Sequence, residues 1–311
     1  MKSLLAIGEC MMELIPEGDE LFRKSYAGDT YNTSVYAKRF LPALNVSFFS
    51  AVGCDDVSEG MLAKWQQEGI NTTHCLKTAD YTVGIYSIAT DAKGERSFSY
   101  WRKNSAATHM MNIKPIDELV RLCSGFDYVF FSGISLGILS ENDKDLFLLF
   151  IAKLKKAGGV IAFDPNYRPA MWNDKAHAIH WLTAAYRLSD IVLPGMEDHE
   201  QLFGHKTYQQ IADFCDDMGI TEVVIKCGDE GTFGFNHNVQ VAHQVFKPAA
   251  VQIDSTAAGD SFAGTYLAAR LNNHSIKESI THASYIAGKV VQYKGAIVSK
   301  KIYQTEFIHN N

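Results

Sequence analysis

The 311-residue chain lacks the features that mark membrane, nucleic-acid-binding and zinc proteins. No stretch approaches the ~18 consecutive apolar residues of a membrane-spanning helix. The formal net charge is −6 and no block of like charge occurs, so we expect no nucleic-acid partner, and bulk charge will not attract an anionic substrate. The six cysteines show no CxxC spacing and no paired histidines, which is typical of reduced thiols in a cytoplasmic protein.

The N-terminus also lacks a complete secretion signal. A basic residue precedes the short apolar run LLAI, but Glu9 and Glu13 interrupt the apolar pattern and no small-residue cleavage site follows. We therefore expect a first buried strand at this place. Internal repeats, low-complexity tracts and linker-like stretches are absent as well, so residues 1–311 are predicted to form one continuous domain.

Short apolar runs alternate along the chain with segments of helical periodicity. Such runs are typical of strands that are buried on both faces of a parallel sheet. The alternation favours βαβ units with right-handed crossovers, and thus an α/β fold with a mostly parallel central sheet. The predicted strands are LLAIG, VSFFSAVG, YVFFSGI, GVIAFD, DIVLPG and EVVIKCG, and the predicted helices span residues 58–68, 141–156, 208–218, 258–271 and 276–293.

Two segments break this alternation. Residues 11–26 and 82–102 alternate polar and apolar side chains with a period of two, as half-exposed strands do. The second segment is predicted to be a hairpin that turns at residues 91–94. We expect the two segments to form a small β lid beside the main sheet, and its open edge invites pairing with a second copy of the chain.

The segment DSTAAGDSFAG, residues 254–264, leads into a predicted helix and permits two interpretations. In the first, Asp254, Ser255 and Thr256 cap the helix, and Asp260 complements the positive end of its dipole. In the second, unpartnered N–H groups at the helix start bind a phosphoryl group, which the small residues allow to come close. Asp260 would then accept the proton of an attacking hydroxyl.

A second segment, YAGDTYNTS, also precedes a predicted helix. Gly28 would let the backbone approach a ligand, while Asp29 and Asn32 offer acceptors and donors suited to sugar hydroxyls. A plain helix cap would use the same residue types.

Two arginines favour an acidic ligand over a neutral one. Tyr100 and Arg102 lie two residues apart and share one face of a predicted strand, and the hairpin would place Tyr86 opposite them. Arg168 follows a predicted parallel strand, where α/β sheets bind ligands. Arginine binds carboxylates through two hydrogen bonds, so the pair indicates a sugar acid. The alternative is aromatic packing across the hairpin with a solvated arginine.

The segment at residues 254–264 resembles the C-terminal signature of the ribokinase-like, or carbohydrate kinase B-type, family, which reads Asp-Thr-x-Gly-Ala-Gly-Asp before a helix. The resemblance covers essentially the whole chain, in order, through GECMMEL, GDTYNTSVYAKRF, GERSFSYWR, SGISLGILS, NYRPAMW and DSTAAGDSF. It implies a ribokinase-like three-layer α/β/α domain with a β-sheet lid, and ATP-dependent phosphorylation of a sugar-acid hydroxyl.

The resemblance also implies roles for single residues. Ala257, Ala258 and Gly259 would form the anion hole, and Asp260 would be the base. Because Ala257 stands where the family has a glycine, its φ must lie below zero. The residues implied to bind the sugar are Gly28, Asp29, Asn32, Tyr86, Tyr100, Arg102, Arg168 and Asp260, and those implied to bind ATP are Asn166, Lys226, Gly228, Gly231, Ala257, Gly259 and Ser284.

One segment departs from the family pattern. The family commonly has Asn-x-x-Glu after the strand DIVLPG, where this chain has Gly195 in place of the asparagine. Glu197, Asp198 and Glu200 are available acids, but they also suit the solvated start of a helix. Mg²⁺ is expected to arrive with ATP, because the phosphate charges demand it, and no protein ligand to the metal is predicted.

Other functions stay open at this point. A fructokinase, a kinase of another sugar acid, or a sugar-acid-binding protein without catalysis would share most of these residues. An NAD-dependent oxidoreductase is disfavoured, because no predicted strand is followed by G-x-G-x-x-G.

Overall fold

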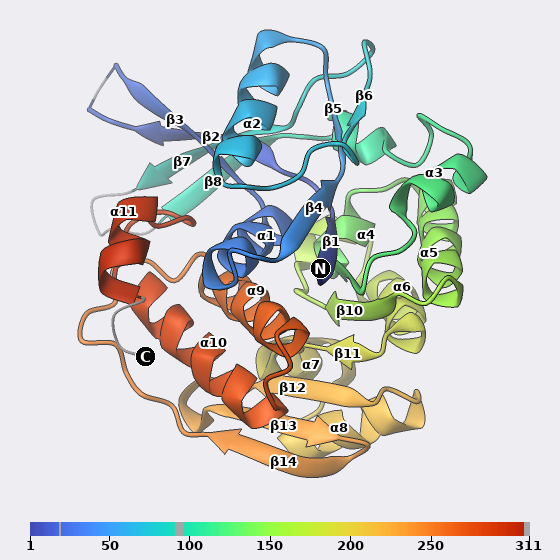
Figure 1. Ribbon diagram of the computed structural model, residues 1–311, viewed down its shortest axis with the longest axis vertical. Helices are drawn as coiled ribbons and strands as arrows, with labels where there is room; N and C mark the ends of the chain where they lie inside the picture. Colours follow the sequence, from blue (N-terminus) through green and yellow to red (C-terminus); the bar gives the residue numbers. More distant parts are fainter. Residues whose placement is uncertain (19, 91–95, 308–311) are drawn as a thin grey trace.

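A sheet of eight strands forms the middle layer of the computed structural model, which describes residues 1–18, 20–90 and 96–307 (Figure 1). Its strand order is β14 (Val239–Gln244), β13 (Thr232–Asn236), β12 (Glu222–Lys226), β11 (Ile191–Val192), β10 (Val160–Asp164), β9 (Tyr128–Ser132), β1 (Ser3–Ile7) and β4 (Asn45–Phe49). The six strands from β12 to β4 in this order pair in parallel, and β13 and β14 are antiparallel, which confirms the mostly parallel sheet.

Helices cover both faces of this sheet because its strands are apolar on both faces. In β1, Leu4 and Ala6 belong to one hydrophobic core, while Leu5 and Ile7 belong to the other, as the alternation of side chains along a strand requires. The first core is closed by α1 (Asp29–Phe40), α2 (Asp56–Gln67), α9 (Ala258–Leu271) and α10 (Ile276–Val290), and the second by α3 (Ile116–Cys123), α4 (Gly133–Gly137), α5 (Glu141–Lys156), α6 (Lys175–Leu188), α7 (Met196–Phe203) and α8 (Tyr208–Asp217).

The predicted helices agree with these bounds to within three residues. Helices α5 and α9 begin and end where their periodicity predicts. Helix α10 ends at Val290 instead of 293, because the chain turns there and the Val291 carbonyl accepts the N–H groups of Ile253 and Asp254. The run VSFFSAVG divides into β4 and a short β5 (Ala51–Val52), which pairs with β6 (Leu76–Lys77) outside the main sheet.

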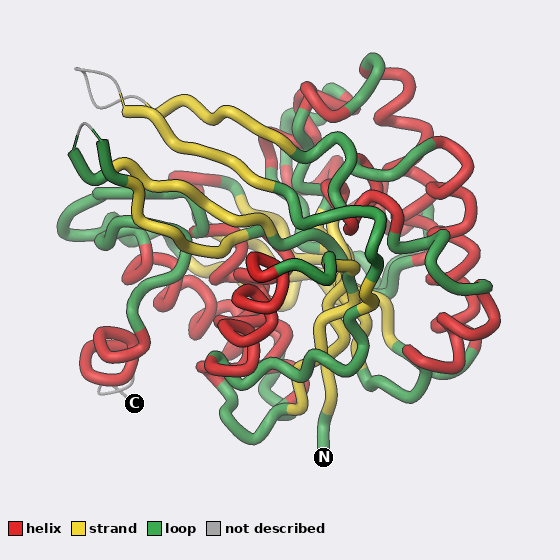
Figure 2. Tube along the Cα trace, turned by 90° about the horizontal axis from the view of Figure 1, so that it is seen from above, coloured by secondary structure: helices red, strands yellow, loops and turns green. Residues whose placement is uncertain are grey.

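The two alternating segments form a separate sheet of four strands, which we call the lid sheet. Its order is β3 (Phe22–Ala27), β2 (Met11–Pro16), β7 (Ile85–Thr90) and β8 (Arg96–Trp101), counted within the described residues. The predicted turn at residues 91–94 lies outside the described part of the chain. Figure 2 shows these strands running together away from the helices, so the lid sheet stands at one end of the main domain.

Short helical turns complete the chain. They are Ala106–His109, Pro169–Met171, Gly228–Glu230, and α11 (Lys300–Ile302), which continues into a π-helical turn at Tyr303–Phe307. In the described ranges, none of the helices is both long enough and apolar enough to cross a membrane.

Helices α1 and α9 pack so closely that their backbones approach each other directly. A Cβ atom at Gly264 would lie 2.2 Å from the carbonyl oxygen of Thr33 and 2.9 Å from the amide nitrogen of Ala37. Only glycine fits there, and this close approach brings the first turns of the two helices together. Asn32 of α1 consequently donates a hydrogen bond to Asp260 of α9.

The variant Gly264→Ala is expected to lose about 3 kcal/mol of unfolding free energy, because its methyl group must push α1 and α9 apart. Urea denaturation measures this loss. Gly288→Ala in α10 is the matched control, since a Cβ atom at Gly288 meets nothing within 4 Å and alanine there is expected to be neutral or stabilising by up to ~1 kcal/mol. Equal stabilities of the two variants would contradict the close-packing interpretation.

Candidate active site

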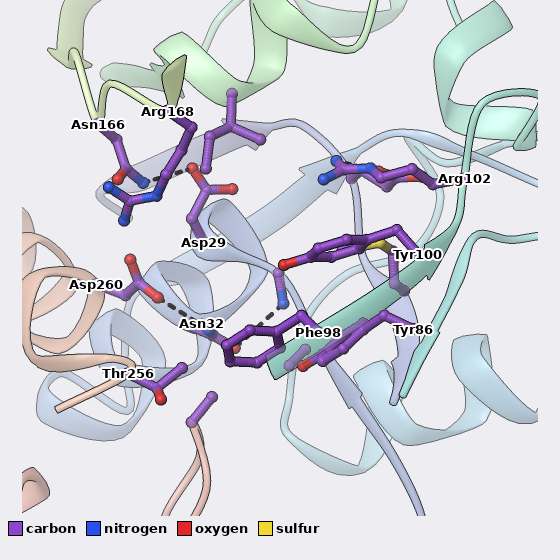
Figure 3. A pocket seen from close by; sticks show the side chains of 16 residues that line it. Asp29, Asn32, Tyr86, Phe98, Tyr100, Arg102, Asn166, Arg168, Thr256 and Asp260 are labelled. Atoms are coloured by element: carbon purple, nitrogen blue, oxygen red, sulfur yellow. Dashed lines mark hydrogen bonds and ion pairs between the residues drawn. The ribbon is translucent and has the colours of Figure 1, made fainter. Parts of the chain in front are cut away.

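A cavity of about 320 Å³ lies between the lid sheet and the carboxyl ends of the main strands (Figure 3). Glu9 follows β1, Ile134 follows β9, and Arg168 follows β10, so each reaches the cavity from the strand end where parallel sheets bind ligands. Tyr86 and Tyr100 reach it from the lid sheet. The cavity is thus closed by both sheets.

The cavity gathers most of the residues that the sequence singles out. All eight residues implied to bind the sugar line it, together with Asn166 from the residues implied to bind ATP. Sequence reasoning missed Phe98, although it lies two residues before Tyr100 and therefore on the same strand face. It also missed Ile134 and Ala296, which carry no chemical signal. The remaining lining residues are Glu9, Met11, Ala27 and Thr256.

Asp260 is the carboxylate with the most strongly raised proton affinity at this cavity. Asn32 Nδ2 donates to Asp260 Oδ2 at 2.8 Å. Burial raises the pKa of Asp260 to about 8, and the nearby carboxylate of Asp29 adds to the rise more than the hydrogen bond from Asn32 opposes it. The side chain is therefore suited to take up a proton near neutral pH.

Asp29 is a second buried carboxylate at the same cavity. Burial raises its pKa, although hydrogen bonds from Ser132, Thr30 and Asn166 oppose the rise. Asn166 Nδ2 donates to Asp29 Oδ2 at 3.1 Å, and its own backbone is left-handed, with φ of 35°. The side chain of Asn166, implied to bind ATP, thus also holds Asp29 in place.

A glycine is required at position 28 because another part of the backbone comes very close to it. Its φ of 172° is extended, and a Cβ atom there would lie 2.1 Å from the carbonyl oxygen of Glu9. The glycine that we expected to admit a ligand therefore admits the chain after β1. Gly28 is the N-cap residue of α1, as the helix-cap alternative expects, although no side chain completes the cap.

The start of α9 also has no side-chain cap. Ala257 is the N-cap residue, with φ of −118°, which confirms the requirement for a φ below zero. The N–H of Ala258 is engaged by the carbonyl oxygen of Ser255 at 3.1 Å, and the bond from Ser261 N–H to the Ala257 carbonyl opens the helix. The amides of Gly259 and Asp260 precede that bond and are left for an anion.

Asp254 serves the fold near this helix start and does not cap it. Its carboxylate accepts hydrogen bonds from the N–H and hydroxyl of Thr256 and, at 2.7 Å, from the N–H of Gly295. The capping interpretation of residues 254–256 is therefore wrong. The bond to Gly295 ties the segment to the loop that carries Ala296 into the cavity wall.

Lys226 lies beside the start of α9, next to two acids. Its Nζ atom is 2.7 Å from Asp164 Oδ2 and 3.9 Å from the position of a Cβ atom on Gly259. Burial raises the pKa of Asp198 to about 6, and the charge of Asp164 contributes to the rise. Asp198 is thus not the solvated acid that a helix start suggests.

The neighbouring acids of α7 differ from Asp198. Glu197 and Glu200 are exposed, and Glu200 pairs with Lys206. These two acids fit the solvated helix start described above. Asp198, three residues after Gly195, is the one that turns toward Lys226.

The other residues implied to bind ATP lie outside the cavity lining. Gly228 and Gly231 have φ of 54° and 90°, and a Cβ atom on Gly231 would lie 2.1 Å from the carbonyl oxygen of Gln244. The Gln244 side chain accepts a hydrogen bond from Thr281 at 3.1 Å. Ser284 is three residues further along α10, on the same face as Thr281.

The two arginines of the cavity differ in their charge balance. Arg102 forms an ion pair with Glu9, whereas Arg168 donates to the carbonyl oxygen of Tyr167 at 3.1 Å. In the described ranges no ion pair joins Arg168 to an acid. Arg168 therefore has no ion-pair partner in the described ranges, although its charge acts on Asp198 and opposes the rise of that acid's pKa.

The aromatic pair of the lid sheet has the expected register. Tyr86 lies opposite Tyr100, with ring centroids 5.7 Å apart. The Tyr86 hydroxyl donates to Glu13 at 2.7 Å.

In the described part of the chain, no group of three or more His, Cys, Asp and Glu side chains could hold a metal ion.

Comparison with known protein families identifies one match along almost the whole chain. Residues 1–302 match the pfkB family carbohydrate kinase description. Among curated relatives, the 2-dehydro-3-deoxygluconokinase of Dickeya dadantii is 35% identical over 301 residues, which are 96% of this chain and 97% of that protein. The protein of that name from Haemophilus influenzae is 35% identical over 96% of each chain, and the fructokinase of Vibrio alginolyticus is 28% identical over 99% of this chain and 98% of its own.

Solved structures show the same architecture. The PfkB protein from Polaromonas sp. JS666 superposes with a TM-score of 0.83 at 25% identity, covering 98% of this chain and 99% of its own. A putative ribokinase II from E. coli, solved with ATP and Mg²⁺, has a TM-score of 0.81 at 22% identity, over 95% of this chain and 94% of its own. The ribokinase-like fold expected from the sequence is confirmed.

Replacement of Asp260 is expected to change the pH dependence of stability. The folded chain keeps a proton on Asp260 up to about pH 8, whereas an unfolded aspartate releases it near its ordinary value of 3.8. The stability of the wild-type protein therefore falls as pH rises between these values. Because three pH units correspond to about 4 kcal/mol, Asp260→Asn should raise the melting temperature by about 6 °C more at pH 8 than at pH 5. Asp217→Asn, at an exposed site, is the control, and a pH-independent difference for Asp260→Asn would contradict the raised pKa.

Proposed function

Because the chain belongs to the pfkB family of carbohydrate kinases, we propose that it transfers the terminal phosphoryl group of ATP to the 6-hydroxyl of 2-dehydro-3-deoxy-D-gluconate. The product is 2-dehydro-3-deoxy-6-phosphogluconate, an intermediate of the Entner–Doudoroff pathway. The observation that carries the proposal is a cavity lined by Arg168, which forms no ion pair within the described residues, and by Asp260, in a chain 35% identical to kinases of that name.

The sugar acid is held at its charged end and along its hydroxyls. Arg168 binds the carboxylate, because it lines the cavity and forms no ion pair within the described part of the chain. Asp29 and Asn32 bind hydroxyl groups near the main sheet, while the Gly28 backbone lines the floor. The lid sheet contributes Tyr86, Tyr100 and Arg102 to the opposite wall. The residues 1–311 act as one kinase domain, and the lid sheet excludes water as a competing acceptor.

The reacting hydroxyl lies next to Asp260. This carboxylate accepts the hydroxyl proton while the oxygen attacks the phosphorus atom in line with the leaving group. Asn32 orients the carboxylate through its 2.8 Å hydrogen bond. The free amides of Gly259 and Asp260 stabilise the equatorial phosphoryl oxygens, and the small side chains of Ala257 and Ala258 let those oxygens approach.

ATP binds on the other side of Asp260, with its phosphates at the start of α9. Lys226 is near enough to Gly259 to contact a phosphate there. Gly228, Gly231 and Ser284 border the surface for the rest of the nucleotide, and Asn166 lies at the boundary with the sugar. When bound with ATP, Mg²⁺ supplies positive charge to the phosphates, and Asp164 and Asp198 beside Lys226 are suited to bind its water molecules.

The proposal is tested by a coupled ADP-release assay with 2-dehydro-3-deoxygluconate, 2-dehydro-3-deoxygalactonate and fructose. We expect turnover on the sugar acid, and a loss of at least ~10²-fold in kcat for Asp260→Asn, since a positioned base contributes that much. Asp217→Asn is the control. Equal efficiency on fructose would favour a fructokinase, and unchanged turnover in Asp260→Asn would remove the base from the mechanism.

Pairing through the lid sheet is part of the same proposal. The edge strands β3 and β8 carry exposed apolar side chains, with Phe22 57% and Trp101 62% exposed, and Leu21 next to β3 is 69% exposed. A second copy of the chain would cover them. Sedimentation at micromolar concentration should show a dimer that Phe22→Asp dissociates, while Val239→Asp on exposed β14 should not. A monomeric wild-type protein would rule this out.

The proposed location of the enzyme is the cytoplasm. All six cysteines are free thiols in the structure, as expected for a reducing compartment.

A further inference from the structure

The segment GECMMEL contains two acids that the proposed mechanism does not use. Glu9 and Glu13 are each only 3% exposed, although glutamate is rarely buried unless it is paired. Both lie on the same side of the chain entering β2, at the period of two that also places Met11 in the cavity wall. A buried carboxylate is costly without compensating partners, so each acid must have a role.

Glu9 is held in one position by two glycines. Its carbonyl oxygen occupies the space that a Cβ atom of Gly28 would need, 2.1 Å away. Its Oε1 atom would lie 2.7 Å from a Cβ atom on Gly84. Larger residues at either position would displace Glu9, so its backbone and its carboxylate are both fixed by contacts.

The carboxylate of Glu9 joins the main sheet to the lid sheet. Glu9 follows β1 of the main sheet, and its ion-pair partner Arg102 follows β8 of the lid sheet. Ser105 donates its hydroxyl hydrogen to Oε1, while Oε2 faces the Arg102 guanidinium in the ion pair and has no hydrogen bond among the described residues. Arg102 itself lines the cavity, close to Tyr100.

Glu9 lines the cavity itself, so a direct contact with the substrate has to be distinguished from an action through Arg102. The ion pair favours action through Arg102, because Oε2 of Glu9 already faces the guanidinium. A double-mutant cycle separates the two.

We propose that Glu9 is a positioning residue for Arg102. It fixes the guanidinium at the lid end of the cavity and cancels its charge, so that Arg102 offers directed hydrogen-bond donors while Arg168 supplies the attraction for the carboxylate. This inference rests on the proposed function, because it requires a sugar acid in the cavity.

A double-mutant cycle tests the proposal. We expect Glu9→Ala and Arg102→Ala each to raise KM for 2-dehydro-3-deoxygluconate about tenfold, with kcat and KM for ATP nearly unchanged. If Glu9 acts through Arg102, the double variant binds the sugar acid no more weakly than Arg102→Ala, within about twofold. Calorimetric titration of the sugar acid without ATP gives the same comparison independently of turnover.

Glu13→Gln is the matched control, because Glu13 is an equally buried acid four residues further along the chain but accepts a hydrogen bond from Tyr86. The fold-change in KM that Glu13→Gln causes should multiply with the fold-change that Arg102→Ala causes. Should Glu9→Ala fail to fold, Glu9→Gln keeps the shape and one acceptor, and its smaller effect must likewise vanish in the Arg102→Ala background.

Two outcomes would overturn the inference. Independent, multiplying effects of Glu9→Ala and Arg102→Ala would show that Glu9 does not act through Arg102. A lower melting temperature of Glu9→Ala with unchanged KM would show a purely structural role. A wild-type protein that does not phosphorylate the sugar acid would instead overturn the proposed function, which separates the two failures.

Discussion

Burial of carboxylates around a single cavity is the constraint on which this structure depends. Each acid is at least partly removed from water and has a different neighbour. Glu9 has a guanidinium, Asp164 has the ammonium group of Lys226, and Asp29 has the amide of Asn166. Asp260 accepts a hydrogen bond from the neutral amide of Asn32; burial and the nearby Asp29 raise its pKa to about 8, although Lys226 opposes the rise. The least compensated carboxylate is thus the one best able to take a proton from a hydroxyl group.

The fold creates this arrangement from distant parts of the chain. The ends of β1 and β10 deliver Glu9 and Asp164, and the close packing of α1 on α9 at Gly264 sets Asn32 beside Asp260. The lid sheet then adds Arg102, whose ion pair with Glu9 spans the two sheets. The surfaces for the sugar and for the phosphate meet at the start of α9, where the N–H groups of Gly259 and Asp260 precede the first hydrogen bond of the helix. A kinase must hold the sugar hydroxyl next to the phosphoryl group. The packing of α1 on α9 brings the two surfaces together at this point.

Local patterns predicted much of this accurately, and the failures have physical reasons. The helix at Ala258–Leu271 follows from apolar spacing alone and has the predicted bounds. The predicted cap at residues 254–256 is wrong, because Asp254 instead accepts a hydrogen bond from the distant Gly295. Gly28 is the N-cap residue of α1, but the close carbonyl oxygen of Glu9 also requires a glycine there. The sequence suited Asp198 to a solvated helix start, because its neighbours Asp164 and Lys226 belong to other strands and are remote along the chain.

The sequence by itself determined the α/β alternation, the two half-exposed segments of the lid sheet, and the chemical groups from which the site is built. These depend on periodicity and on residue type, which are local properties of the chain. Only the tertiary structure decided which carboxyl has a raised proton affinity and which arginine has an acid partner. Burial raises the pKa of Asp260, and Glu9 forms an ion pair with Arg102, whereas Arg168 forms none among the described residues. Proton affinity and net charge depend on desolvation and on neighbours that are remote in sequence, and these exist only once the chain has folded.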